Sequence, residues 1–396
     1  MTRALVAGAL LLAGCVADDG CGDDLARPPT PPTFAVVSSD YTSTAIGLLD
    51  ADGTVLTASW VDSGTARPGI VAALSGDVVL PSAPFGPCNV VLVDRYGTDV
   101  VSWLDPCADE AVVGQVDVGS SFDSNPHDVL RVGGSAWVTR YRANPAAAPG
   151  APDAGDDIAI VEGGRVARRI DLAAFGDGEA RARPDRMARL GSPGEDVVVV
   201  GLARSSEDFM PAGVGAVAVV DPRTLEARLH FVDGLVACGE VDPVGDAVVV
   251  TCQGPPFADE EGRRPGAGVV AYRLEGGALV EVAAYRAVEH PGAPVPAGPT
   301  IPLAADAWIT VAWGDVLEGR PDRLLSLTAD EARVLLEASA FTLGDGTYDA
   351  AHDLVLVPDA DAGVIRRLRA DGTERASVDA TGCHGLPPRE VRRVLP

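Results

Sequence analysis

The chain contains no lysine: all 31 of its basic residues are arginine, and 57 acidic residues outnumber them, for a formal charge of −26. A field of that sign repels nucleic-acid phosphates and anionic lipid, so we expect no nucleic-acid partner. Aromatic residues make up only 5% of the chain, so aliphatic side chains must fill the core. Beyond residue 15, no apolar run approaches the roughly 18 residues that a membrane helix needs.

Common catalytic and cofactor motifs are also missing. The sequence has no G-x-S-x-G, no P-loop, no dinucleotide-binding glycine pattern and no C-x-x-C-H haem motif. We therefore predict no cofactor from sequence motifs.

The first fifteen residues, MTRALVAGALLLAGC, have the layout of an export signal. Arg3 precedes the apolar stretch Ala4 to Gly14, which is too short to cross a bilayer but has the length of a signal-peptide h-region. The LLAGC sequence at its end resembles the bacterial lipobox, which implies that Cys15 is diacylated after cleavage before it. An ordinary secretory signal is the alternative. Because two or more acyl chains anchor a protein stably, we expect a lipid anchor to be the only membrane contact.

These features divide the N-terminal region in two. Residues 1–14 are assigned to a lipoprotein signal peptide and residues 15–33 to a lipidated tether, because VADDGCGDDLARPPTPPT is rich in Asp, Gly and Pro. Residue 16 is valine rather than aspartate. By resemblance to enterobacterial sorting, this implies an outer-membrane lipoprotein of the cell envelope.

Six cysteines remain after Cys15, an even number that suits disulfides in an oxidising compartment. Cys88 and Cys107 flank two strand-like runs about a Tyr-Gly-Thr turn, and Cys238 and Cys252 flank two runs about a Pro-Val-Gly turn. Each pair would meet at the open end of a hairpin, within the short Cα separation that a disulfide needs. We predict both disulfides, in preference to a metal site.

From residue 34 onward the chain is a series of strand-like runs divided by Gly, Asp and Pro, without long helical periodicity. One unit recurs seven times: a β run, an irregular acidic or Pro/Gly loop, and a second β run. The second copy is taken as DVVLPSAPFGPCNVVLVDR, residues 77–95. The spacing of about 40 to 60 residues is typical of propeller blades or of a solenoid.

A second recurring segment favours a closed ring. PHDVLRV (126–132), PDRMARL (184–190) and PREVRRV (388–394) align without gaps, and the first two precede a β run. The third stands at the C-terminus, whereas the first β run, FAVVSSDY, has no such segment before it. We therefore predict an all-β fold, a single seven-bladed β-propeller over residues 34–396. Its C-terminal strand would join the first blade and so protect the sheet edges.

Two cysteines, Cys21 and Cys383, lie at opposite ends of the folded chain. They can bond only if the two ends meet, and a closed ring would bring them together. We predict a Cys21–Cys383 disulfide on that condition.

The AWVTRY segment, residues 136–141, resembles the repeat of the Tyr-Val-Thr-Asn propellers, some of which resemble lactonases. FDSNPHDVLRVGGSAWVTRY followed by DDIAIVE also resembles uncharacterised propeller lipoproteins of GC-rich deltaproteobacteria such as myxobacteria. The resemblance covers most of the chain after the tether. The blades vary in length, however, and the second could hold an extra strand, so six and eight blades are the alternatives to seven. The resemblance implies ligand sites at one mouth of the central channel.

Four long insertions join the two runs of one repeat and should project from one face; they are residues 143–156, 204–214, 253–266 and 313–323. Their many acidic residues would form a rim suited to a protein or glycan partner, or to Ca²⁺. The carboxylates of DADAG (359–363) and AGDD (154–157) lack EF-hand spacing, so solvated loops are the alternative.

The candidate catalytic residues are His127, Asp128 and His384. His127 and Asp128 stand at the entry to an expected inner strand, and His384 stands near the equivalent entry of the closing strand. Both histidines would approach the channel mouth and could bind metal or act as a general base. The alternative is that His127 belongs to a turn-capping SNPHD motif. We expect the arginines that recur in register to bridge neighbouring blades: Arg131, Arg189 and Arg393.

Two functions are compatible with these features. The first is a monomeric binding scaffold that displays its acidic loop-rich face to a protein or glycan. The second is a metal-dependent, lactonase-like hydrolase with ligands from several blades around one divalent ion. Propellers host unrelated functions, so the fold alone does not choose between them. The lack of a catalytic constellation favours binding.

Overall fold

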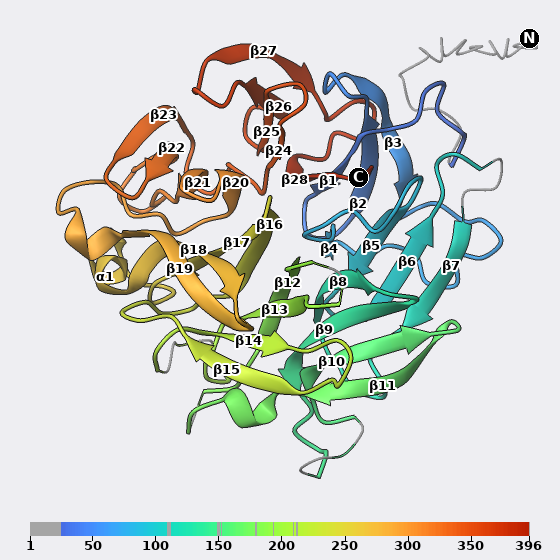
Figure 1. The fold of residues 1–396 in the computed structure, drawn as a ribbon. Helices are drawn as coiled ribbons and strands as arrows, with labels where there is room; N and C mark the ends of the chain where they lie inside the picture. Colours follow the sequence, from blue (N-terminus) through green and yellow to red (C-terminus); the bar gives the residue numbers. More distant parts are fainter. Residues whose placement is uncertain are drawn as a thin grey trace, which may run out of the picture.

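The computed structural model describes residues 25–108, 112–148, 151, 153–178, 180–192, 194–208, 210 and 213–395. Seven four-stranded antiparallel sheets stand around a central axis (Figure 1). The chain is a seven-bladed β-propeller, which confirms the predicted fold class and the predicted number of blades. Among the described residues, no helix is both long enough and apolar enough to span a membrane.

Each blade is numbered here in ring order, with its strands given from the axis outwards. Blade 1 contains β28 (Pro388–Arg393), β1 (Phe34–Ser39), β2 (Thr44–Leu49) and β3 (Val55–Asp62). Blade 2 contains β4 (Val78–Val79), β5 (Val90–Asp94), β6 (Val100–Leu104) and β7 (Val112–Asp117). Blade 3 contains β8 (Pro126–Val132), β9 (Ser135–Ala143), β10 (Gly155–Glu162) and β11 (Arg165–Asp171).

Blades 4 and 5 contain β12 (Pro184–Leu190), β13 (Val197–Leu202), β14 (Ala216–Val220) and β15 (Ala227–Phe231); and β16 (Glu240–Val244), β17 (Ala247–Gln253), β18 (Ala267–Glu275) and β19 (Ala278–Arg286). Blades 6 and 7 contain β20 (Thr300–Ala304), β21 (Ala307–Ala312), β22 (Asp322–Thr328) and β23 (Ala332–Ala338); and β24 (Thr347–Asp349), β25 (Leu354–Asp359), β26 (Val364–Leu368) and β27 (Glu374–Asp379). The described helices are short: α1 (Glu260–Arg263) and the 3₁₀ turns Ala173–Phe175, Arg264–Gly266 and Ala287–Glu289.

The ring closes through the C-terminal strand, as predicted. β28 pairs antiparallel with β1, with Val391 opposite Val36, and becomes the innermost strand of blade 1. The three aligned segments of the sequence, at residues 126–132, 184–190 and 388–394, are therefore equivalent: they supply the innermost strands β8, β12 and β28.

The prediction for the second repeat unit, residues 77–95, was wrong about which strands of the blade it supplies. Its two runs form β4 and β5, the first and second strands of blade 2, whereas the other copies form the second and third strands of their blades. Blade 2 has four strands and no extra one. The error arose because β4 is only Val78–Val79, so its short DVVL run looked like the start of a unit.

Residues 25–33, assigned above to the tether, pack on blade 1. Leu25 is buried, and its backbone N–H donates to the carbonyl of Trp60 at 2.7 Å. The indole of Trp60 donates in turn to the carbonyl of Ala26 at 3.0 Å. Residues 1–24, with Cys15 and Cys21, lie outside the described residues.

Aliphatic side chains fill the space between blades. Every residue of β1, β2, β13 and β25 is buried, because a strand near the axis has a neighbouring sheet on both faces. Outermost strands such as β27 alternate between exposed and half-buried residues. The aliphatic clusters are shared between neighbouring sheets, so the ring has a continuous core rather than seven separate ones.

The antiparallel topology gives the propeller two different faces. The loops between the second and third strands of each blade and the segments that join successive blades lie at one end of the axis, here named the loop face. The turns within the other strand pairs lie at the opposite end, the hairpin face. The described parts of all four predicted insertions connect second and third strands, so they share the loop face as expected.

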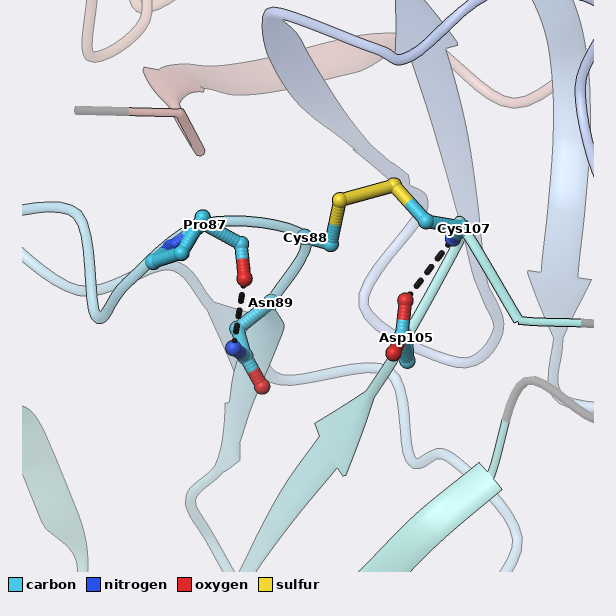
Figure 2. Close-up of a disulfide and its surroundings, with 5 residues drawn as sticks. All are labelled: Pro87, Cys88, Asn89, Asp105 and Cys107. Carbon is cyan, nitrogen blue, oxygen red and sulfur yellow. Dashed lines mark hydrogen bonds between the residues drawn. A yellow bond between two sulfur atoms is a disulfide. The ribbon is translucent and has the colours of Figure 1, made fainter.

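Both hairpin disulfides are confirmed. Cys88 and Cys107 meet at the open end of the β5–β6 hairpin, with their Cα atoms 5.7 Å apart (Figure 2). Asp105 accepts a 2.8 Å hydrogen bond from the backbone N–H of Cys107 and so shapes the turn beside the bond. Cys238 and Cys252 join across β16 and β17, with a Cα separation of 4.0 Å.

Cys383 is also disulfide-bonded. Its predicted partner, Cys21, lies outside the described residues. The Cys21–Cys383 pairing therefore stays a prediction.

Candidate functional site

The innermost strands β28, β4, β8, β12, β16, β20 and β24 surround the central channel (Figure 1). The aligned segments that form β8, β12 and β28 carry a charged residue two positions after the proline: Asp128, Arg186 and Glu390. All three side chains are buried in the ring. This register position, rather than the recurring arginine five positions after the proline, brings the blades together.

Arg186 lies at the centre of the charged residues in the channel. Its guanidinium donates to the carbonyl of Leu80 at 2.6 Å, to Glu390 at 3.2 Å and to Asp345 at 3.3 Å. These contacts join blade 4 to blades 1, 2 and 7. A buried arginine with this many partners fixes the relative positions of the inner strands, because its planar donors tolerate little displacement.

Arg392 of β28 makes a second set of bonds beside the first. It donates to Asp242 of β16 at 2.9 Å and to Asp345 at 2.6 Å, so Asp345 is shared by both arginines. We name these buried and half-buried groups the channel cluster: Arg186, Arg392, Glu240, Asp242, Asp345 and Glu390.

The channel cluster contains four carboxylates and two guanidiniums. Two carboxylate oxygens, Oε2 of Glu240 and Oδ1 of Asp345, are buried without a hydrogen-bond donor among the described residues. Burial raises the pKa of Glu240 to about 8, although Arg186 opposes the shift. Burial also raises the pKa of Asp242 and of Glu390. Two guanidiniums do not balance four ionised carboxylates, and Glu240, whose buried Oε2 has no donor among the described residues, is the carboxylate that most favours its neutral form.

His127, a predicted site residue, does lie at an inner strand, and it pairs with a residue that the sequence analysis missed. Its Nδ1 is 2.8 Å from Oδ1 of Asp185 on β12. The imidazole stacks on Tyr141, with the ring centroids 4.1 Å apart. Asp185 follows its proline as His127 does, so the alignment of β8 with β12 contained the signal for this pair.

The electrostatics of this pair favour a neutral imidazole. Burial lowers the pKa of His127, although Asp185 opposes the shift. Burial acts to raise the pKa of Asp185, but His127 and Arg186 favour the carboxylate and hold that pKa below its usual value. With Nδ1–H donated to Asp185, the lone pair of Nε2 is left without a hydrogen bond from the described residues. Burial also raises the pKa of Tyr141 to about 12, so its phenol stays protonated.

Asp128 has a structural position rather than an open one. Its carboxylate accepts from the backbone N–H and hydroxyl of Ser82 at 3.0 and 2.6 Å, and from the N–H groups of Val129 and Met187 at 2.8 and 2.7 Å. These donors come from blades 2, 3 and 4. The carboxylate therefore ties three blades together.

His384 does not approach the channel, contrary to the expectation. Its Nε2 lies 3.1 Å from the carbonyl of Ala58 on β3, the outermost strand of blade 1. Its Nδ1 accepts from the N–H of Leu386 at 2.9 Å. The connection from β27 to β28 crosses from the outer edge of one blade to the axis, and His384 lies at the outer part of that path.

The recurring arginines bridge blades in one case out of three. Arg393 lies 3.5 Å from Asp349 of blade 7, as expected. Arg189 pairs with Asp196 of its own blade at 2.5 Å, and Arg131 has no ion pair with a described residue.

Among the described residues, the histidines and carboxylates considered as candidates from the sequence do not come together as a group of metal ligands. Within the described residues, the one group of three or more His, Cys, Asp or Glu ligand atoms close enough for a metal is Cys88, Asp105 and Cys107. Its two sulfur atoms are bonded to each other, which removes them as thiolate ligands.

The loop face carries an open apolar cavity between blades 5 and 6, of about 560 Å³. Side chains from residues 253–263 form one side and side chains from residues 313–320 the other. We name it the loop cleft. Trp313 and Phe341 line it, with ring centroids 6.3 Å apart. At its rim, Phe257 is 77% exposed and Leu317 is 96% exposed.

The sequence matches no protein-family model and no curated protein. The structure is similar to a Bacteroides fragilis protein provisionally assigned as a 6-phosphogluconolactonase, with a TM-score of 0.56 and 13% identity over 92% of this chain and 98% of that chain. A Lactobacillus plantarum protein has a TM-score of 0.56 and 10% identity over 92% and 99% of the two chains. A hypothetical selenium-binding protein from Sulfolobus tokodaii also has a TM-score of 0.56, with 11% identity over 94% and 97%.

These neighbours share the propeller fold. The chain therefore resembles lactonase-like propellers in architecture, and at these identities the likeness extends to the fold alone.

Proposed function

We propose that this protein is a binding scaffold whose loop face engages a protein partner through the loop cleft, while a lipid on Cys15 holds it in the cell envelope. The exposed apolar side chains of the cleft carry the proposal. A folded monomer seldom leaves several large apolar side chains in water around one cavity unless they contact something else. Phe257, Val316 and Leu317 are all exposed at this one position.

The composition of the cleft suits an apolar side chain of the partner. Trp313 and Phe341 provide an aromatic floor, and aromatic residues are scarce in this chain, at 5%. Three carboxylates, of Asp259, Glu260 and Asp315, and two guanidiniums, of Arg263 and Arg320, stand around these rings, so the charged lining has one more acidic than basic group. With a formal chain charge of −26, we expect the apolar anchor of the partner to be flanked by basic residues. Tightly bound anchors of this kind contribute most of the affinity of an interface.

The test uses a displayed library of 12-residue peptides selected against the disulfide-bonded propeller. We expect binders with an apolar residue next to arginine or lysine, and at least a tenfold loss of affinity in Leu317→Asp and in Phe257→Asp. Val71→Asp is the matched control, because Val71 is 86% exposed in the connection between β3 and β4, away from the cleft. Equal losses in all three variants, or binding to arrayed glycans in place of peptides, would contradict the proposal.

A second candidate function, hydrolysis of lactones, is favoured by the His127–Asp185 pair. A neutral imidazole held by a carboxylate through Nδ1 can take a proton from water at Nε2. If this pair is catalytic, His127→Gln lowers the hydrolysis of a panel of γ- and δ-lactones about 100-fold or more, and His230→Gln leaves it unchanged. Repeating the assay with chelator and with Ca²⁺ tests the predicted metal dependence. Lactone turnover no faster than in buffer would eliminate this function.

A further inference from the structure

The channel also has a cavity of about 700 Å³ on the side of the hairpin face. Gly245, in the turn between β16 and β17, and Pro84, in the link between β4 and β5, mark this side. Pro243, Pro302 and the ring of Tyr348 form much of its wall. We name it the channel cavity. It lies at the opposite end of the axis from the loop cleft.

One side chain presents an unused charged atom to this cavity. The side chain of Asp242 is only 4% exposed and lines the cavity. Its Oδ1 accepts from Arg392 at 2.9 Å, whereas its Oδ2 accepts no hydrogen bond from a described residue. Protein atoms do not fully enclose Oδ2, so this oxygen borders open space. A ligand in the cavity can therefore reach it.

The charges behind Asp242 favour a cation in this position. Because Glu240 keeps its proton near neutral pH, three ionised carboxylates of the channel cluster face two guanidiniums, and Oδ1 of Asp345 has no hydrogen-bond donor among the described residues. Two arginines also line the cavity, and each is paired with a carboxylate. Arg392 bonds to Asp242 and Asp345, and Arg393 lies 3.5 Å from the fully buried Asp349. Water molecules carry no net charge and cannot neutralise the excess carboxylate of the channel cluster, whereas a bound cation can.

We propose that the channel cavity binds a small organic cation, with a primary ammonium group on Oδ2 of Asp242 and its carbon chain against the proline and tyrosine walls. A single carboxylate oxygen within apolar walls suits an alkylammonium. A hard metal ion would need six to eight oxygens in one place, and no group of three acidic or histidine ligand atoms stands together here among the described residues. The site is independent of the partner proposed for the loop face.

The probe is putrescine, compared with n-butylamine and CaCl₂ at matched ionic strength, with binding measured by calorimetry and by thermal unfolding of the disulfide-bonded protein. We expect both amines to bind and to raise the melting temperature. Asp242→Asn should weaken amine binding at least tenfold, because it keeps the shape of the side chain and removes its charge.

A second variant tests the cavity without altering the channel cluster. Thr347→Arg places a bulky cation at the cavity wall and should abolish amine binding, and Thr373→Arg, on the exposed outer edge of the same blade, should not. Three results would overturn the proposal: no binding of either amine, amine affinity unchanged in both Asp242→Asn and Thr347→Arg, or stabilisation by Ca²⁺ without any by the amines.

Discussion

The channel and the loop cleft both depart from the usual distribution of side chains, in which charged groups are exposed and apolar groups are buried. In the channel, charged groups are buried on regular inner strands and bond to one another across blades. In the loop cleft, aromatic and aliphatic groups are exposed on the insertions between strands. Buried charge and exposed apolar surface are the two arrangements that ordinary folding does not favour.

The buried charges of the channel and the exposed apolar groups of the loop cleft have different consequences for stability. The channel groups depend on one another, since removing one partner leaves another charge buried and unpaired. Trp313 packs against the core, but the rim residues Phe257 and Leu317 are mostly exposed to solvent, so the fold does not need these two side chains. This contrast predicts large effects on stability from the channel and small ones from the cleft.

The largest effect is expected from Arg186→Met. It leaves Glu390 and Asp345 without one of their donors in the channel, and we expect the free energy of unfolding to fall by about 3–5 kcal/mol. Urea denaturation measures the loss. Arg189→Met on the same strand is the control, because Arg189 pairs with Asp196 at a partly exposed position and should contribute about 0–1 kcal/mol. Equal losses from the two variants would refute the special role of the channel.

A pH dependence of stability is expected from Glu240. Its pKa is raised from 4.5 in the unfolded chain to about 8 in the folded one, so the folded chain keeps a proton that the unfolded chain releases between these values. The contribution of Glu240 is therefore full below pH 4.5 and is lost as the pH rises to 8, by at most about 5 kcal/mol at 1.36 kcal/mol per pKa unit. Denaturation from pH 5 to 8.5 should show a steeper decline for the native chain than for Glu240→Gln. Parallel curves would show that Glu240 is not buried in the charged network.

The smallest effect is expected from Leu317→Asp in the loop cleft. Because this side chain is almost fully exposed, the free energy of unfolding should change by no more than about 0.5 kcal/mol, even where peptide binding is lost. The same denaturation experiment measures it. A loss above about 2 kcal/mol would mean that the cleft packs within the fold, which would remove the contrast with the channel.

Local patterns in the sequence predicted much of the architecture. The seven β-rich units, the strand supplied by residues 388–394 and the two hairpin disulfides follow from periodicity and turn spacing, which depend on neighbours along the chain. The second unit was misplaced because β4 has only two residues in regular pairing. A short strand leaves too little periodicity to align.

The candidate site was less predictable. His127 was placed correctly at an inner strand, but its partner Asp185 was not selected, although both follow the proline of aligned segments. The same alignment places Asp128, Arg186 and Glu390 at one register position, whereas the arginine that recurs in all three segments lies three positions later. The prediction that His384 approaches the channel was wrong, because the distance of this residue from the axis depends on the path of the segment that connects β27 to β28.

By itself, the sequence determined that this chain forms a ring of β-sheets, because strand periodicity, turns and hairpin cysteines act over short stretches of chain. Only the tertiary structure decided which charges meet in the channel, which histidine reaches it, and which apolar side chains stay exposed. Those outcomes depend on contacts between residues more than a hundred positions apart, such as Arg186 with Glu390. Closing the ring brings such residues together, and no local pattern encodes the distance between them.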